Sequence, residues 1–288
     1  MNRKYLGAIF MALAASIWGG MYVVSKIVLE SVQPLALVWL RYVVALAALV
    51  LAALLTRQSW RIRSRDIPLI VAIGVIGYAI SIWAQFLGTK LSTAQMGSVI
   101  TSATPAFMVV FGRMILGERV TLRKAMSVGL ATIGVLMIVG VGAVGQKYET
   151  GGVILFVAAL TWALMSVLVK RVPAEYSQLV VTTYAILVAT LLITPVGLRQ
   201  LHGTGDIFSH RVLWGGVLYL GIISTAGAFF LWNKGLQMVD AASGGLYFFF
   251  QPLVGSFLAW AILGERVTLV FWVGAVLILT AVLLVVRE

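Results

Sequence analysis

The sequence contains no cysteine and few charged residues, and both absences narrow the class of protein. Without cysteine, neither a disulfide framework nor a thiolate metal site can form. Charged residues make up 10% of the chain and hydrophobic residues 61%, whereas roughly a quarter of a soluble domain is charged. The mean hydropathy is +1.06. A soluble protein of 288 residues cannot bury so much apolar surface, so the composition excludes a soluble fold.

Acidic residues are also scarce. The chain has 9 Asp and Glu and 21 Lys and Arg, which gives a formal charge of +12. A basic chain can bind nucleic acid, but no RNA- or DNA-binding motif accompanies this charge. The basic residues instead form short clusters between apolar runs, as the orientation of a membrane protein requires. We therefore expect the chain to interact with a lipid bilayer and not with a nucleic acid.

Apolar runs of about 20 residues, the length that a helix needs to cross a bilayer, recur from end to end. The first run is longer than the core of a signal peptide, so we interpret it as an uncleaved helix. The longest connection, Gly197–Val212, contains His202 and His210. The sequence predicts an all-α membrane protein with ten transmembrane helices, over Tyr5–Val24, Leu35–Leu55, Ile67–Gly88, Thr93–Ile115, Leu122–Gly142, Gly152–Val169, Leu179–Val196, Leu213–Lys234, Ala241–Leu263 and Leu269–Val286.

The Lys and Arg residues of alternate loops predict the orientation of these helices. With a cytoplasmic N-terminus, the basic clusters fall in cytoplasmic loops: Arg57, Arg61, Arg63 and Arg65, then Arg119, Arg123 and Lys124, then Lys170 and Arg171. The outer loops receive single charges: Lys26, Lys90, Lys147 and Arg266. We therefore expect both termini in the cytoplasm.

One octapeptide, Ile-Leu-Gly-Glu-Arg-Val-Thr-Leu, occurs twice, over residues 115–122 and 262–269. A proline stands ten residues before each copy, Pro105 in one case and Pro252 in the other. The first spans of the two halves also align, with Trp18 opposite Trp162. The chain is therefore a duplication, with one repeat in residues 1–145 and the second in residues 146–288.

Each repeat holds five predicted spans, and an odd number makes the second repeat enter the membrane upside down. Inverted repeats place a site where the two halves meet and give one cavity two related gates. The topology therefore predicts two inverted five-helix repeats around a central cavity, and transport by alternating access.

These features resemble the EamA-type transporters of the drug/metabolite transporter superfamily. The resemblance covers essentially the whole chain and rests on the doubled five-span halves, the tryptophan in each first span, Arg41 in span two, and the proline before each Leu-Gly-Glu-Arg. It implies a basket in which spans one to four and six to nine surround the cavity and spans five and ten are peripheral. It also implies export of amino acids or other small metabolites across a bacterial inner membrane, without indicating one substrate.

Aromatic and neutral polar residues at helical spacing suggest a pocket walled by rings with a few polar groups. Arg41 either snorkels to the outer headgroups or pairs with a substrate carboxylate. Thr104 and Gln251, beside the two prolines, either face the substrate or satisfy the backbone there. The predicted substrate-binding residues are Trp18, Tyr22, Arg41, Tyr78, Gln85, Thr101, Thr104, Trp162, Tyr247 and Gln251.

The octapeptides and prolines are predicted to be structural, with a gate as the alternative. Each proline should kink its span in mid-helix by removing a backbone hydrogen bond. Within each octapeptide the glycine should end one helix in a left-handed cap, the threonine should cap the next, and the glutamate should favour its positive end. As a gate, each loop would close through a Glu–Arg pair. These gate or structural residues are Pro105, Gly117, Glu118, Arg119, Pro252, Gly264, Glu265 and Arg266.

No Asp or Glu lies near the centre of a predicted span. Proton-driven exporters of cationic drugs commonly use such a carboxylate to bind cation and proton in turn. Its absence favours neutral or zwitterionic cargo over drugs and toxic cations, and leaves the coupling ion open.

Signals for an enzyme, a cofactor or a metal site are weak. Gly140–Gly145 matches a dinucleotide fingerprint in letters, but it lies at the exit of a predicted span and not between a strand and a helix. The two histidines share their loop with Asp206, which is too few ligands for a metal. We expect no catalytic residue, no cofactor and no metal.

The sequence thus predicts a secondary transporter that exports small metabolites, first among them neutral or zwitterionic amino acids with aromatic or bulky apolar side chains. Efflux of drugs or toxic cations is the alternative within transport. A non-transporting membrane scaffold is the alternative from another class, and it should have a dry, leucine-filled interface between the halves. The exact substrate and the oligomeric state stay open.

Overall fold

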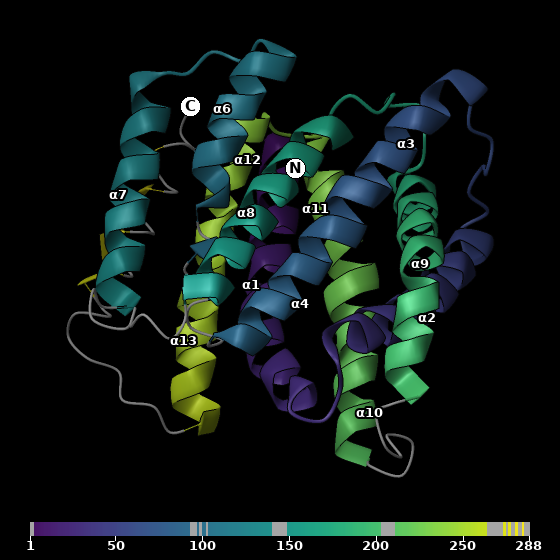
Figure 1. Cartoon of the computed structure of the whole chain (residues 1–288). Helices are drawn as coiled ribbons and strands as arrows, with labels where there is room; N and C mark the ends of the chain where they lie inside the picture. The colour runs from purple at the N-terminus through teal and green to yellow at the C-terminus, as the bar shows by residue number, and fades with distance from the viewer. Residues whose placement is uncertain are drawn as a thin grey trace.

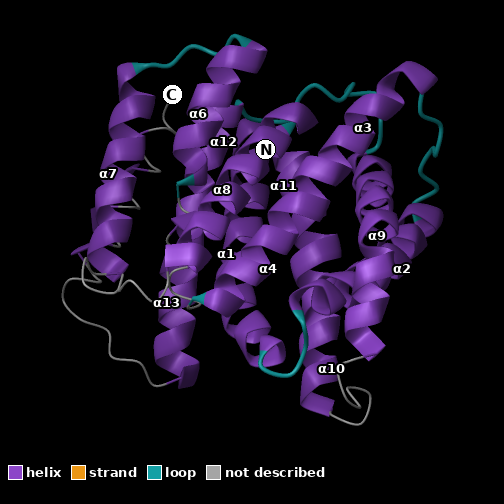
Figure 2. Ribbon diagram, in the orientation of Figure 1, coloured by secondary structure: helices purple, strands orange, loops and turns teal. Residues whose placement is uncertain are grey.

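The computed structural model is helical, and the residues that it describes include no strand (Figure 2). Its helices pack side by side in one bundle (Figure 1). The structure describes residues 3–92, 97, 100–101, 103–139, 149–202, 211–263, 273–274, 276–277, 280–281 and 284.

The two halves of the chain contain similar series of elements. The first half forms α1 (Arg3–Leu29), α2 (Pro34–Leu55), η1 (Ser64–Asp66), α3 (Ile67–Ile73), η2 (Gly74–Ser81), α4 (Ile82–Leu91), α6 (Thr104–Leu116) and α7 (Leu122–Val139). The second half forms α8 (Glu149–Val169), α9 (Gln178–His202), α10 (Arg211–Leu218), η5 (Tyr219–Gly227), α11 (Ala228–Leu236), α12 (Ala241–Gly245), η6 (Leu246–Phe249) and α13 (Phe250–Leu263). In both halves a π-helix, η2 or η5, interrupts the third span.

Six helical stretches of the described chain are long and apolar enough to cross a bilayer. They are Arg3–Leu29, Pro34–Leu55, Ser64–Leu91, Thr150–Val169, Gln178–His202 and Arg211–Leu236. The helix α6 is apolar but shorter, and most of the predicted tenth span lies outside the described residues. The chain is therefore a multi-pass membrane protein.

The helix α9 is longer than its apolar pattern predicted, because it continues to His202. Its last turns hold the start of α2, since Gln200 Oε1 accepts hydrogen bonds from the backbone N–H groups of Leu35 at 3.0 Å and Ala36 at 3.3 Å. N–H groups at a helix start lack partners within their own helix. The predicted loop from Gly197 is therefore wrong in its first residues, which are helical.

Each π-helix packs on a helix of the other half, and the two contacts are alike. Gly74 of η2 approaches α9 so closely that a Cβ atom would lie 2.5 Å from the Ala185 carbonyl oxygen. Gly221 of η5 approaches α2, where a Cβ atom would lie 2.6 Å from Val44 Cβ and 3.0 Å from the Arg41 carbonyl oxygen. Glycine is required at both contacts because the backbones touch. The two halves thus pack on each other reciprocally.

The first helices of the two halves run in opposite directions. Lys26, near the end of α1, donates to the Ser92 carbonyl oxygen at 3.1 Å, and the start of α8 packs on Ser92 through Gly151. At the other end of the bundle, Lys170 after α8 donates to the Val239 carbonyl oxygen, and the N-terminal turns of α1 pack on Val239. The end of α1 therefore lies beside the start of α8, and at the other end of the bundle the end of α8 lies beside the start of α1 (Figure 1).

Both prolines stand in the first turn of a helix, so the predicted mid-helix kinks are wrong. Pro105 is the second residue of α6, after a turn at Ala103. Pro252 is the third residue of α13, directly after the 3-10 turn η6. Proline is tolerated there because N–H groups of the first turn have no partner within the helix. The break in regular helix therefore precedes each proline.

Since α2 crosses the bilayer, the loops at its two ends lie on opposite sides. Ser31 and Ser59 are exposed in these loops, and the cysteine-free chain allows single cysteines to be labelled. If the termini are cytoplasmic, a membrane-impermeant maleimide should label Ser31→Cys in intact cells and should reach Ser59→Cys only after permeabilisation. Labelling of Ser59→Cys alone in intact cells would reverse the orientation, and labelling of both would contradict the crossing.

Candidate functional site

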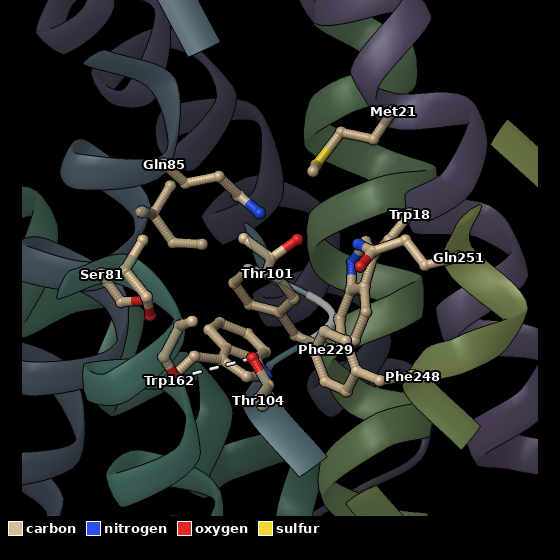
Figure 3. Close-up of a pocket in the computed structure, with 13 residues that line it drawn as sticks. Trp18, Met21, Ser81, Gln85, Thr101, Thr104, Trp162, Phe229, Phe248 and Gln251 are labelled. Carbon is tan, nitrogen blue, oxygen red and sulfur yellow. Dashed lines mark hydrogen bonds between the residues drawn. The ribbon is translucent and has the colours of Figure 1, made fainter. Parts of the chain in front are cut away.

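A pocket of about 340 Å³ lies inside the bundle, where α1 and α4 of the first half meet α8 and α11 of the second half (Figure 3). Residues of η2, α6, η6 and α13 complete its wall. It is lined by Trp18, Met21, Ser81, Ile82, Gln85, Thr101, Thr104, Ala158, Ala159, Trp162, Phe229, Phe248 and Gln251.

Six of the ten predicted substrate-binding residues line this pocket: Trp18, Gln85, Thr101, Thr104, Trp162 and Gln251. The other four, Tyr22, Arg41, Tyr78 and Tyr247, are buried but are not lining residues. Spans two and seven, which we expected around the cavity, contribute no lining residue in the described chain. Their helices α2 and α9 pack on each other and on the π-helices, behind the wall.

Seven lining residues were not predicted: Met21, Ser81, Ile82, Ala158, Ala159, Phe229 and Phe248. One of them could have been found from the repeat. The octapeptides are 147 residues apart, and this spacing places Phe248 opposite Thr101, which was predicted. The alanines and Ile82 carry no chemical signal, because apolar residues of these types are equally common in helix packing.

A chain of hydrogen bonds fixes the amide of Gln85. Thr101 Oγ1 donates to the Gly97 carbonyl oxygen at 2.6 Å, so the Tyr22 hydroxyl must donate to Thr101 Oγ1 at 2.8 Å. The Tyr22 oxygen then accepts from Gln85 Nε2 at 2.8 Å. Gln85 Oε1 is buried without a partner. Tyr22 thus orients Gln85 from behind the pocket wall, and leaves a hydrogen-bond acceptor unused at the pocket.

The rings of four other residues gather around Trp18. Its ring centroid lies 5.2 Å from that of Trp162, 5.3 Å from Trp232, 5.6 Å from Phe248 and 5.8 Å from Phe229. Edge and tilted contacts at these distances are the favoured arrangements of aromatic pairs. The cluster gives one side of the pocket a rigid aromatic wall.

The two repeat-related tryptophans differ in their hydrogen bonds. Trp18 Nε1 donates to the Ser224 carbonyl oxygen of η5 at 2.9 Å. Trp162 Nε1 is buried without a partner. A buried N–H group without an acceptor costs about 1–3 kcal/mol. Trp162 therefore offers the pocket one unused donor, whereas Trp18 is held by the neighbouring π-helix.

One hydrogen bond occurs in both halves with different chemistry. Gln85 bonds Tyr22 in the first half, and at the equivalent place Trp232 Nε1 donates to Ser166 Oγ at 3.1 Å in the second half. The octapeptide spacing relates Gln85 to Trp232, and the first-helix alignment relates Tyr22 to Ser166. The duplication therefore kept the contact and changed its side chains. The first half lines the pocket with Ser81, Gln85, Thr101 and Thr104 besides Trp18, and the second half with Trp162, Phe229 and Phe248 besides Gln251.

Arg41 is fully buried, which excludes snorkelling to the headgroups. Its exposed fraction is 0%, and its Nε donates to Thr225 Oγ1 of η5 at 2.7 Å. Its Nη1 lies 3.7 Å from Met21 Sδ. Its Cζ lies 5.0 Å from the ring centroid of Phe86 and 5.7 Å from that of Phe229. The guanidinium therefore points into the protein, directly behind two residues of the pocket wall.

Tyr78 supports the wall from behind. Its hydroxyl accepts from Asn233 Nδ2 at 2.8 Å, and its ring stacks on Phe229 with centroids 4.8 Å apart. Its carbonyl oxygen accepts from the Tyr42 hydroxyl at 2.7 Å. Tyr247 is likewise buried, in η6. Tyr78 is therefore placed to hold the lining residue Phe229, and neither Tyr78 nor Tyr247 lines the pocket.

The first octapeptide loop is tied to the second half of the chain. Glu118 Oε1 lies 3.6 Å from Lys170 Nζ and accepts from the Ala241 N–H at 2.9 Å. Lys124 Nζ lies 2.8 Å from Asp240 Oδ1. We call Glu118–Lys170 and Lys124–Asp240 the inter-half ion pairs. Glu118 thus stabilises the start of α12 in the second half, a contact that its predicted role at the start of the next helix did not include.

The other predicted roles in the loop are partly confirmed. Gly117 ends α6 in the left-handed conformation with φ of 68°, and Thr121 Oγ1 accepts from the Lys124 N–H at 3.3 Å. Arg119 is exposed, and its carbonyl oxygen accepts from the Lys124 side chain. The equivalent residues of the second octapeptide, Gly264, Glu265 and Arg266, lie outside the described residues.

The described residues contain no group of three His, Asp or Glu that could hold a metal ion. His202 lies at the end of α9. His210, Asp206 and Gly140–Gly145 lie outside the described part of the chain.

Tyr22→Phe should lower the free energy of unfolding by about 1–3 kcal/mol, because it leaves the buried Gln85 Nε2 without an acceptor. The matched control is Tyr5→Phe, on the same helix but 55% exposed. Thermal unfolding of both purified variants measures the difference. Equal melting temperatures for Tyr22→Phe and wild type would contradict the hydrogen-bond chain.

Asp240→Asn should destabilise the protein in a pH-dependent way. Burial raises the pKa of the Asp240 carboxyl, but hydrogen bonds from Lys124 and Ser243 outweigh it and hold the pKa below its usual value. A carboxyl with a lowered native pKa stabilises the fold above its unfolded pKa, and this stabilisation is lost as the pH falls through the native pKa. Asp240→Asn should therefore have a lower melting temperature than wild type at neutral pH. The difference between the two melting temperatures should disappear at acidic pH.

The control for Asp240→Asn is Glu175→Gln, which breaks the ion pair between Glu175 and Arg63. Both side chains of this pair are exposed, Glu175 by 50% and Arg63 by 56%. Exposed ion pairs contribute little. Equal melting temperatures for the two variants at neutral pH would show that the Lys124–Asp240 pair does not stabilise the fold.

The EamA-like transporter family model matches the chain twice, over residues 5–140 and 150–287. Each of the two matched segments contains one copy of the octapeptide. The doubled match agrees with the repeated elements and reciprocal packing of the structure.

Individual proteins show the same relationship. The chain is 62% identical over 71 residues to the putative permease-like protein YdzE of Bacillus subtilis (strain 168), a match that covers 25% of this chain and 91% of that protein. It is 25% identical over 280 residues to a probable terminal-alkyne amino-acid exporter of Streptantibioticus cattleyicolor, covering 96% of this chain and 92% of that one. A crystal structure at 20% identity has the same fold, with a TM-score of 0.79 over 96% of this chain and 95% of its own. The chain is a membrane transporter that belongs to the EamA-like transporter family.

Proposed function

We propose that the chain is a secondary transporter that exports small zwitterionic amino acids with aromatic or bulky apolar side chains. It works by alternating access in a bacterial inner membrane, with both termini in the cytoplasm. Ten helices form two inverted repeats, residues 1–145 and 146–288, around the central pocket. The opposite directions of α1 and α8 support the inverted arrangement.

The polarity of the pocket is the observation that carries this proposal. Gln85 Oε1 and Gln251 Oε1 are buried acceptors without partners, and Trp162 Nε1 is a buried donor without one. All three residues line the pocket. Buried polar groups without partners are rare in folded proteins. A zwitterion suits this set, because its ammonium group donates to the acceptors Gln85 Oε1 and Gln251 Oε1.

The rings of the second half supply the place for an apolar side chain. Phe229 and Phe248 line the pocket across from Gln85 and Thr101 (Figure 3). The similar amino-acid exporter of Streptantibioticus cattleyicolor also favours an amino acid as the substrate class.

The inter-half ion pairs support alternating access. Glu118 and Lys124 of the first half bind Lys170 and Asp240 of the second half at one end of the bundle. Opening the pocket toward that end requires these pairs to separate. They are placed to act as the closed state of one gate.

Efflux of organic cations is the second candidate, because the ring cluster around Trp18 could bind a cation through its aromatic faces. Against it, the pocket residues include no Asp or Glu in the described chain. A scaffold is less well supported, because its interface should be dry and apolar, whereas polar groups line this pocket.

The test is counterflow of labelled phenylalanine into liposomes that contain the purified protein, with amino acids and cationic drugs as competitors. Saturable uptake that bulky apolar amino acids inhibit is the expected result. Trp162→Ala should raise KM about tenfold, since burying a large apolar group contributes about 1.5–3 kcal/mol. Trp83→Ala is the matched control, because Trp83 is 40% exposed and lies outside the pocket. Inhibition by cationic drugs without amino-acid flux would favour the second candidate.

A further inference from the structure

Arg41 has a positive charge in the interior of the protein and no acidic partner among the residues that the structure describes. Its side chain is 0% exposed, and the ion pairs among the described residues do not include it. Its Nη2 is buried without a hydrogen-bond acceptor. A guanidinium stays charged at any relevant pH. Charged side chains inside membrane proteins are costly and are typically retained for function.

We propose that Arg41 binds the carboxylate of the transported molecule, and that Met21 is the movable side chain that separates Arg41 from the pocket. The inference rests on the proposed function and deepens it, because it assigns one end of the zwitterion to one residue.

The groups around Arg41 hold its cation without neutralising it. Thr225 occupies Nε at 2.7 Å. The rings of Phe86 and Phe229 lie within cation–π distance of Cζ, at 5.0 and 5.7 Å. The outer edge of the guanidinium, formed by Nη1 and Nη2, remains for an anion. A carboxylate fits this edge with two parallel hydrogen bonds.

Met21 covers that edge and also lines the pocket. Its Sδ lies 3.7 Å from Arg41 Nη1, and a thioether is a weak acceptor that a carboxylate replaces with a strong one. Methionine is unbranched and has three rotatable side-chain bonds, so it changes rotamer more easily than a branched residue. A rotation of Met21 would connect Arg41 to the pocket.

The position of Arg41 also matches the geometry of an α-amino acid. Met21 and Gln85 lie at the same end of the pocket in Figure 3, away from Thr104 and Phe248. Gln85, whose Oε1 has no partner, and Met21, which covers the cation, therefore stand at one end of the pocket, where the ammonium and carboxylate of an α-amino acid would both bind. The apolar side chain then points toward the rings.

The repeat shows that this cation is particular to one half. Gly221 packs on the Arg41 carbonyl oxygen, and the repeat-related Gly74 packs on that of Ala185. Ala185 is thus the structural equivalent of Arg41 in the second half. A cation shared by both halves would suit a symmetric structural role, whereas a single one favours one substrate orientation.

The test measures binding through tryptophan fluorescence, since Trp18 and Trp162 line the pocket. The purified protein is titrated with phenylalanine, phenylalaninamide, 3-phenylpropionate and 3-phenylpropionamide, two pairs that differ in the carboxylate. Wild type should bind each acid more tightly than its amide. Arg41→Gln should lose about ten- to a hundredfold in acid affinity, the usual effect of a charge-assisted hydrogen bond, with little change for the amides.

Three further variants separate this role from a structural one. Arg41→Lys should keep part of the preference for acids. Met21→Ala should raise the affinity for acids but not for amides, because it uncovers Arg41, and this variant decides the question if Arg41→Gln does not fold. Arg211→Gln, which removes an exposed cation at the start of α10, should behave as wild type.

Equal affinity of wild type for acid and amide, or an acid preference that survives Arg41→Gln, overturns the carboxylate site. The proposed function fails in a different way. If acids bind through Arg41 but phenylalanine shows no counterflow, the site stands and export of amino acids does not.

Discussion

The interior of a bilayer has no water to pair free backbone groups, and this constraint shapes the whole structure. Regular helices satisfy it, but each half contains a π-helix, where the regular hydrogen-bond pattern is interrupted. Side chains from other helices bind carbonyl oxygens there, Tyr42 at Tyr78 in η2 and Trp18 at Ser224 in η5. Trp18 also lines the pocket. The same side chain therefore stabilises the irregular backbone and forms the site.

Duplication supplied the frame, and divergence of equivalent residues gave the pocket its polarity. The bond of Gln85 with Tyr22 corresponds to the bond of Trp232 with Ser166. A hydrogen bond between side chains occurs at equivalent positions in both halves, but one half offers an amide there and the other a ring. A symmetric pocket could not distinguish the two ends of a ligand. Because each half contributes different chemistry, this pocket can hold a molecule with one polar end and one apolar end.

The two ends of the bundle use a related lysine contact with unequal reinforcement. Lys26 donates to the Ser92 carbonyl oxygen at one end, and Lys170 donates to that of Val239 at the other. The alignment of the halves makes these contacts equivalent. At the second end the Lys124 ion pair adds a further tie between the halves. Alternating access needs two gates of comparable stability, and the related contacts are a suitable basis for them.

The sequence by itself determined the membrane location, the duplication and the family, because apolar runs and repeated motifs are properties of neighbouring residues. Trp18 and Trp162, which the sequence predicted as substrate-binding residues, both line the pocket. Only the tertiary structure decided that Glu118 binds Lys170 and that Arg41 lies behind Met21. These contacts join residues on different helices, and helix packing sets them. A pattern along one helix shows which face is apolar, but not which helix covers that face.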